Sequence, residues 1–209
     1  MSRAATPTVA VAEPCARTPG RPRDEQATRA IHEAALRLLA EHGYARISME
    51  RVAAEAGVSR ATVYRRYHDK ADLVTAAIAA DIEEPPTRPS NDPRRDLVRF
   101  LEAFDARFAS PCLAVIGTLL GGDEDPHGMD LHRERVIEPR SAYARGLLSR
   151  AQELGQLDPE ADVDLALQML VGAVFARRVN GLPSDRVWAR RAVDAVWRGM
   201  APSSGNGPA

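Results

Sequence analysis

Hydrophobic residues recur at intervals of three and four along almost the whole chain, in segments separated by glycine, proline and small polar residues. That spacing places the apolar side chains of each segment on one face of an α-helix, and no segment alternates as a strand does. The pattern predicts an all-α protein of about nine helices, with a three-helix domain at residues 24–69 and a larger helical domain at 70–200. Residues 1–23 and 201–209 have no hydrophobic period, and we expect them to be disordered.

The first helix is expected to run from about Asp24 to His42, where a glycine ends it. Its buried stripe consists of Ile31, Ala34, Ala35, Leu38 and Leu39. Asp69, with Asp72 three residues later, predicts a capping box at the start of a fourth helix that runs to about Glu84. We expect this fourth helix to connect the two domains.

Between these helices, residues 48–70 predict two short helices that meet at a tight turn. Ser48 is a suitable N-cap for the first, Gly57 ends it, and Ser59 can cap the second at once. The first helix buries Met49, Val52, Ala53 and Ala56. A turn of about three or four residues containing glycine is the connection of a helix-turn-helix motif.

The second helix of this motif presents a basic, hydrogen-bonding surface. Val63 and Tyr67 lie one turn apart and should face the core, which directs Ala61, Thr62 and Arg65 outward. The flanks carry Arg60, Tyr64 and Arg66. Arginine can pair with guanine in the major groove, while threonine, tyrosine and lysine hold phosphates, so the surface suits DNA. The alternative is a solvated face on a helix-turn-helix that serves only packing.

The order of small and aromatic residues in this region follows a recognisable pattern. A first helix ends in glycine and an aromatic, serine opens the next, and Ala-Gly-Val-Ser, Tyr-x-x-Tyr and a lysine before leucine follow. The residues are Gly43, Tyr44, Ser48, Ala56 to Ser59, Tyr64, Tyr67, Lys70 and Leu73. From Ala27 onward, about 45 residues thereby resemble the N-terminal domain of the TetR family of bacterial transcriptional regulators. Arg65 and Arg66 depart from the pattern, since many members carry aromatic residues or histidine there.

The resemblance implies a ligand-responsive regulator, most often a repressor, that binds a palindromic double-stranded operator as a dimer. A small molecule bound in the C-terminal domain would change the separation of the two DNA-binding heads. Arg60 and Arg65 are candidates for base readout, and Ala61 would let the helix approach closely. The positions that resemble phosphate-holding ones are Ser48, Thr62, Tyr64, Arg66 and Lys70.

A short basic segment precedes the first helix. Arg17, Arg21 and Arg23 lie among proline and glycine, and extended basic arms of this kind can enter a narrow minor groove. A solvated leader that adds only diffuse charge is the simpler interpretation, and we adopt it.

Aromatic residues mark the start of the larger domain, after a proline-rich linker at residues 85–93. Phe100, Phe104 and Phe108 recur at helical spacing and, with Met169, are the candidate wall of a ligand pocket. Core packing is the simpler interpretation of any one of them. If these side chains filled the pocket, the protein would be a DNA-binding dimer without small-molecule control.

The helices expected at residues 162–179 and 185–200 are apolar on more than one face. A helix that is apolar on two sides needs one partner within its subunit and another outside it. We therefore expect a four-helix interface in an obligate homodimer. Its candidate residues are Leu170, Gly172, Ala173, Val174, Trp188, Val193 and Trp197.

No catalytic or metal-binding constellation is evident, and we expect neither a cofactor nor a metal. Residues 121–128 are rich in acidic side chains and histidine, and Glu124 and His127 form an ExxH pair. Because Pro126 lies between them, we expect a hydrated loop and not a helical ligand pair. Farther on, Pro139 should kink or break the helical pattern of residues 129–154. An all-helical enzyme with an added helix-turn-helix is the least favoured hypothesis.

Composition agrees with this interpretation. The chain has 209 residues, of which 44% are hydrophobic and 27% charged, as in ordinary globular proteins. The formal net charge of -1 hides an asymmetry, since residues 1–70 hold 12 basic and 8 acidic residues. No apolar run is long enough for a membrane span or a signal peptide, so we expect a cytoplasmic protein. Cys15 and Cys112 match neither a disulfide framework nor a zinc site.

Overall fold

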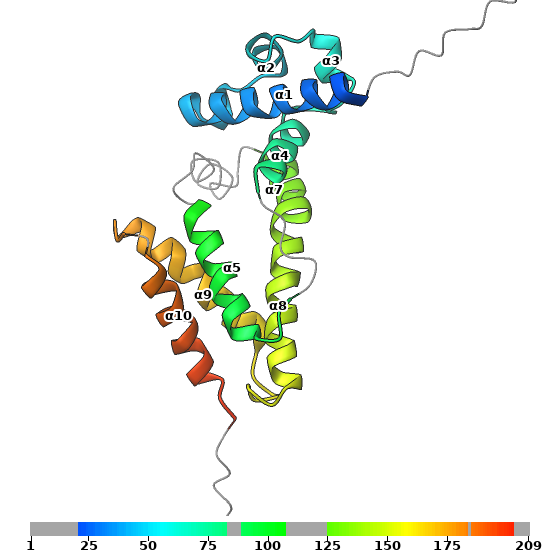
Figure 1. The fold of residues 1–209 in the computed structure, drawn as a ribbon. Coiled ribbons are helices and arrows are strands. Elements are labelled where there is room, and N and C mark those ends of the chain that lie inside the picture. Colours follow the sequence, from blue (N-terminus) through cyan, green and yellow to red (C-terminus); the bar gives the residue numbers. More distant parts are fainter. Residues whose placement is uncertain (1–20, 83–88, 108–124, 184, 203–209) are drawn as a thin grey trace, which may run out of the picture.

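The structure is a computed structural model that describes residues 21–82, 89–107, 125–183 and 185–202. Within these ranges every regular element is helical, as the hydrophobic spacing predicts (Figure 1). The N-terminal elements are α1 (Arg21–His42), the 3-10 turn η1 (Tyr44–Arg46), α2 (Met49–Glu55), α3 (Arg60–Tyr64) and α4 (Lys70–Asp81). The C-terminal elements are α5 (Pro93–Arg107), α7 (Pro126–His132), the π-helical turn η2 (Arg133–Ile137), α8 (Glu138–Glu153), α9 (Val163–Val179) and α10 (Arg186–Gly199). 

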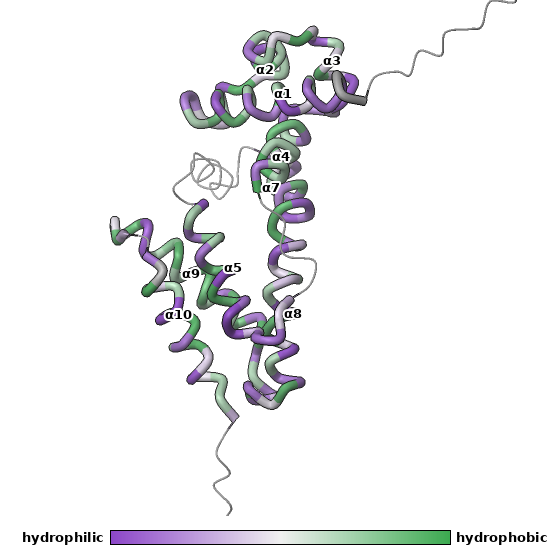
Figure 2. The backbone as a smooth tube through the Cα atoms, viewed as in Figure 1, coloured by the Kyte–Doolittle hydropathy of each residue, from purple (hydrophilic) through white to green (hydrophobic). Residues whose placement is uncertain are grey.

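The first helices pack around α1, which carries the predicted buried stripe. Ile31, Ala34 and Leu39 are at most 1% exposed and lie in one cluster with Val52 of α2 and Val63 of α3. The cluster continues through the apolar helix α4, which is coloured mostly hydrophobic in Figure 2. Burial of each large side chain contributes about 1.5–3 kcal/mol. The short helices α2 and α3 are therefore held by tertiary packing and not by their own length.

Side-chain caps set where these helices begin. Ser48 Oγ accepts a hydrogen bond from Arg51 N at 3.2 Å, and Asp69 Oδ1 accepts one from Asp72 N at 2.8 Å. Both caps confirm the prediction. The reciprocal bond of the predicted box is shifted by one residue, because the Asp72 carboxylate accepts from the backbone N–H of His68.

Helix α1 begins earlier than predicted. It starts at Arg21, so Arg21 and Arg23 lie in its first turn and not in an extended arm. Pro22 does not prevent this, because the first turn of a helix leaves its N–H groups unused and tolerates proline. The boundary predicted at residue 24 was therefore wrong by three residues. Arg17 lies outside the described residues.

The C-terminal helices share a second core. Leu97 and Leu101 of α5 pack with Leu147 and Leu148 of α8, and α9 and α10 close the cluster. Helix α4 joins the two parts, since it contacts α1 on one side and α7 and η2 on the other (Figure 1). Among the described residues, no helix is both long and apolar enough to cross a membrane.

Two predictions about the middle of the chain change. Part of the expected loop at 121–128 is helical, because α7 begins at Pro126 and Asp125 caps it through a bond from Gly128 N at 2.9 Å. Proline at the first helical position is favourable, which the loop prediction overlooked. Glu124 lies outside the described residues. Pro139 does not break the helical segment, because α7, the π-helical turn η2 and α8 follow one another without a gap; the hydrogen-bonding pattern changes to π-helical in η2, directly before the first turn of α8 that holds Pro139.

Candidate nucleic-acid interface

The exposed side of α3 is the one that the sequence predicts. Val63 is fully buried and Tyr67 is 7% exposed, while Arg60, Ala61 and Arg65 are exposed. The orientation depends on Gly57, whose φ of 65° turns the chain between α2 and α3. Ser59 then caps α3 by accepting from Thr62 N at 3.2 Å. Exposed arginines at the first residue of α3 and at its C-cap, with the small Ala61 between them, therefore face outward.

Two hydrogen-bonding side chains at the edge of this surface have partners within the domain. The Thr62 hydroxyl lies 2.8 Å from Ser59 Oγ. The Tyr64 hydroxyl donates to Glu50 Oε1 at 2.5 Å, and this bond lowers the pKa of the Glu50 carboxyl. Tyr64 is still 51% exposed. Both groups are therefore accessible to a phosphate, although Tyr64 must release Glu50 to donate to one.

Arg66 is placed differently from the prediction. Its side chain is only 14% exposed, donates to the Thr62 carbonyl at 2.9 Å and forms an ion pair with Asp24 of α1. Asp24 lies in the first turn of α1, 42 positions before Arg66, so no local pattern indicates its carboxylate as the partner. Arg66 therefore ties α3 to α1 and is not a free basic group.

Lys70 lies at the start of α4 against Tyr44. Its ammonium is 4.1 Å from the centroid of the Tyr44 ring, and Nζ donates to the Tyr44 carbonyl at 3.3 Å. Arg51, in the first turn of α2, is a further exposed basic residue and donates to the Arg46 carbonyl at 2.8 Å. Arg51 was not among the predicted DNA-binding residues, although it lies three residues after the Ser48 cap.

The candidate ligand residues separate into two places. Phe100 and Phe104 stack with ring centroids 6.4 Å apart, and Tyr143 and Phe175 join them at 6.4 and 6.2 Å. Met169 is 56% exposed on α9, so its assignment to the same pocket was wrong. Its apolar character does not reveal which face of α9 it occupies. Phe108 lies outside the described residues.

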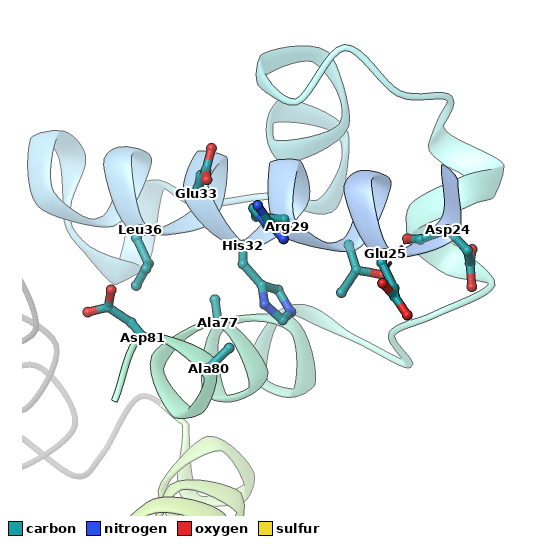
Figure 3. A pocket seen from close by; sticks show the side chains of 10 residues that line it. Asp24, Glu25, Arg29, His32, Glu33, Leu36, Ala77, Ala80 and Asp81 are labelled. Carbon is teal, nitrogen blue, oxygen red and sulfur yellow. Dashed lines mark hydrogen bonds between the residues drawn. The ribbon is translucent and has the colours of Figure 1, made fainter. Parts of the chain in front are cut away.

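A groove of about 490 Å³ lies elsewhere, between α1 and α4 (Figure 3). Leu36, Ala77 and Ala80 lie between the two helices, and charged side chains surround them. This groove is separate from the aromatic cluster of Phe100. Among the described residues, no group of three or more histidine, cysteine, aspartate or glutamate side chains is placed to hold a metal ion.

The candidate interface residues also divide. Leu170, Val174 and Val193 are at most 1% exposed and belong to the core of the C-terminal domain, so they cannot form an outer face. Trp188 and Trp197 are half-buried against the same core, while Gly172 is exposed and Ala173 half-buried. The large apolar side chains that remain exposed on α9 and α10 are Leu165, Met169, Val179 and Val187, with exposures of 52%, 56%, 87% and 67%.

Two family models match the chain. Residues 31–77 match the bacterial regulatory proteins of the tetR family, and residues 88–196 match the tetracyclin repressor-like C-terminal domain. Together they span both helical parts of the structure.

Individual proteins agree with these matches. The uncharacterised HTH-type transcriptional regulator Mb1581 of Mycobacterium bovis is 30% identical over 81% of this chain and 86% of its own length. The DNA-binding transcriptional repressor TetR of Mycobacteroides abscessus is 29% identical over 83% and 93%. The crystal structure of the TetR family regulator SCO0332 is 29% identical, covers 85% of this chain and all of its own, and superposes with a TM-score of 0.62. A structure of FadR from Bacillus subtilis in complex with stearoyl-CoA shares the fold, with 19% identity, a TM-score of 0.64 and coverage of 82% and 98%.

Proposed function

The chain belongs to the TetR family of bacterial regulatory proteins and is a DNA-binding transcriptional regulator. From that premise we propose that it acts as a repressor, in the cytoplasm where bacterial DNA lies, and that α3 enters the major groove. The observation that carries the proposal is the outward face of α3, where Arg60 and Arg65 are exposed around the small Ala61. The similarity to the M. abscessus repressor supports the direction of control.

Base readout falls to Arg60 and Arg65. Each guanidinium can donate two parallel hydrogen bonds to guanine O6 and N7, which is the commonest specific contact in the major groove. Phosphates are held by Ser48, Thr62, Tyr64 and Lys70 at the ends of α2, α3 and α4. Arg66 supports this surface indirectly, because it fixes α3 to α1 through Asp24.

The active form is a homodimer on a palindromic operator. Leu165, Met169 and Gly172 follow one another at i, i+4 and i+7 on the exposed side of α9, and Val187 adds apolar surface on α10. Soluble proteins rarely leave such a stripe exposed, so a second copy of the chain is its partner. This face replaces Leu170, Val174 and Val193, which the subunit core already buries.

A small apolar effector is proposed to bind beside the aromatic cluster. Phe100, Phe104, Tyr143 and Phe175 are all half-buried, so their rings retain surface that a ligand can cover. The FadR complex shows that one protein of this fold binds stearoyl-CoA. The alternative is that these rings fill the cavity themselves, which would leave a DNA-binding dimer without small-molecule control. An enzymatic function has less support than either of these two hypotheses, because both family models describe regulators.

A gel-shift experiment on the DNA that flanks the gene tests these points. The wild-type chain should shift this DNA in the presence of excess non-specific competitor, and the Arg60→Ala, Arg65→Ala double variant should not. Release of the DNA by an apolar compound, lost in Phe104→Trp, would support the effector. Equal shifts by wild type and double variant would contradict base readout by α3.

A further inference from the structure

One buried tyrosine lies between the two domains. Tyr44, in the turn after α1, is 4% exposed, and its hydroxyl donates to Oδ2 of Asp125 at the start of α7. The other oxygen of the same carboxylate accepts the capping bond from Gly128 N. A single side chain of the C-terminal domain therefore caps its own helix and holds a residue of the DNA-binding domain.

Lys70 contacts the same tyrosine through both its ring and its backbone carbonyl. The ring faces the Lys70 ammonium at 4.1 Å, and the Tyr44 carbonyl accepts from Nζ at 3.3 Å. A free lysine side chain has about 2 kcal/mol of rotamer entropy to lose when it contacts a phosphate. The two contacts with Tyr44 already restrict the Lys70 side chain in the absence of DNA, so less rotamer entropy is lost when it contacts a phosphate. Asp125, Tyr44 and Lys70 thus form a continuous series of contacts from α7 to the candidate DNA surface.

The packing around Asp125 leaves little room for another arrangement. A Cβ atom on Gly128 would lie 2.9 Å from Asp125 Oδ2 and 3.2 Å from the Tyr44 hydroxyl. Since real Cβ atoms do not approach so closely, a side chain at this position would push the carboxylate and the phenol apart. Gly128 therefore leaves the space that the Asp125 carboxylate and the Tyr44 hydroxyl occupy in this bond.

The bond joins a charged and a neutral partner. Burial first, and then the neighbouring carboxylate, raise the pKa of Tyr44, while the phenol hydrogen bond lowers the pKa of Asp125. At neutral pH an ionised carboxylate thus accepts from a neutral phenol, which is among the stronger hydrogen bonds in proteins. Two further contacts reinforce the junction nearby: the His127 imidazole lies 3.4 Å from the Asp69 carboxylate, and Arg135 forms an ion pair with Asp72 at 2.5 Å.

We propose that Asp125 is a positioning residue for DNA binding. It holds the Tyr44 hydroxyl, Tyr44 fixes the Lys70 ammonium, and Lys70 contacts an operator phosphate. A displacement of α7 therefore changes a phosphate contact without moving α3. The inference rests on the proposed phosphate role of Lys70.

The test removes one atom from the series and measures operator affinity over a range of salt concentrations. Tyr44→Phe keeps the ring beneath Lys70 and loses only the hydroxyl. Its affinity should fall about fivefold, as loss of one hydrogen bond predicts. The slope of log affinity against log salt should also become shallower, toward the slope of Lys70→Ala, which itself should be about one unit shallower than wild type. Asp125→Ser, which can still cap α7, should reproduce Tyr44→Phe.

Tyr67→Phe is the matched control. It also removes the hydroxyl of a buried tyrosine in the DNA-binding domain, but this hydroxyl lies 2.7 Å from His32 Nε2 of the same domain and does not contact Asp125. It should lower the melting temperature and leave the salt slope unchanged. In the Lys70→Ala background, Tyr44→Phe should cause no further loss of affinity. An unchanged salt slope in Tyr44→Phe, or an equal loss with and without Lys70, would overturn the inference.

The same set of variants distinguishes a failure of this inference from a failure of the proposed function. If Lys70→Ala leaves the salt slope unchanged, Lys70 holds no phosphate and the inference fails with it. Base readout would then still be judged independently, from the effect of Arg60→Ala on base preference. Loss of sequence preference in Arg60→Ala together with a normal slope in Tyr44→Phe would retain the proposed function and reject the positioning role.

Discussion

Three arginines follow one another closely on and after α3, and the structure gives them different environments. Arg60 and Arg65 are exposed, whereas Arg66 is 14% exposed and paired with Asp24. Helical spacing predicted the outward direction of Arg65 and the flanking place of Arg66. It did not show the Asp24 partner, because an ion pair between residues 42 positions apart leaves no periodic signal.

Replacing Arg65 should therefore affect binding in a different way from replacing Arg66. Arg65→Ala should cost about 1–3 kcal/mol of operator affinity and relax the preference at one base pair. Arg66→Ala should weaken binding to all sequences alike and lower the melting temperature, because its ion pair with α1 is lost. Titration of both variants against operators with single base-pair changes distinguishes the two effects. Arg37→Ala, on the exposed side of α1, is the control and should bind as wild type.

A buried histidine makes stability depend on pH. His132 of α7 is 4% exposed, its Nδ1 has no hydrogen-bond partner among the described residues, and burial together with the nearby Arg140 lowers its pKa. The unfolded chain, with an imidazole pKa near 6.5, then binds more protons than the folded one. The stability that neutral His132 contributes is thus complete above that value and is lost as the pH falls through the lower folded pKa.

Thermal unfolding at several pH values between about 8 and 5 checks this expectation. The melting temperature of the wild type should fall toward the acid end, and His132→Gln should show a smaller fall. His32, whose pKa burial also lowers, is a second contributor, so His32→Gln should reduce the fall as well. The same pH dependence in wild type and both variants would contradict the assignment.

At the scale of elements, the turn between α2 and α3 depends on the backbone of one residue. Gly57 has φ 65° and open space around a hypothetical Cβ, so an alanine there meets no neighbour but must adopt a left-handed conformation. Gly57→Ala should therefore lower the free energy of unfolding by about 1–2 kcal/mol. Gly146, on the exposed side of α8, is the matched control, since Gly146→Ala should stabilise the protein by about 0.5–1 kcal/mol. Denaturant titration of both variants measures the difference, and a destabilised Gly146→Ala with an unaffected Gly57→Ala would contradict it.

Element boundaries were predictable where a side-chain cap or a glycine marks them. Ser48, Gly57, Ser59 and Asp69 occupy the predicted positions. The start of α1 was missed because residues 21–23 have no hydrophobic period, and the start of α7 because Pro126 was taken as a helix breaker where the first helical turn accepts it. The local sequence thus predicts most helix boundaries. The error at α7 arose because proline disrupts the interior of a helix but is favourable in its first turn.

At the scale of the whole molecule, the sequence showed that α9 and α10 are apolar on two sides but not which side the subunit buries. That choice depends on the packing of α5 and α8 against them, which no local pattern encodes. The structure assigns Leu170, Val174 and Val193 to the inside. A charge at Val193 would therefore unfold the subunit and cannot serve as a test of the dimer.

A charge on the outer face should instead separate the subunits. Met169→Glu leaves the core of the C-terminal domain intact, because Met169 is 56% exposed, and should give a folded monomer that binds the operator weakly. Ala103→Glu, on the exposed side of α5, adds the same charge elsewhere and should remain a dimer. Sedimentation at micromolar concentration checks the mass of each. A wild-type chain that sediments as a monomer would contradict the proposed dimer.

The central claim is that two copies of α3, held apart by a symmetric dimer, read a palindromic operator. A hydroxyl-radical footprint of the wild-type chain on DNA selected from a random library tests it most directly. We expect two identical half-sites related by a two-fold axis, with centres about one helical turn or a multiple of it apart. Arg65→Ala should lose protection in both half-sites equally. A footprint confined to one asymmetric half-site, or selected DNA without a shared sequence, would contradict the claim.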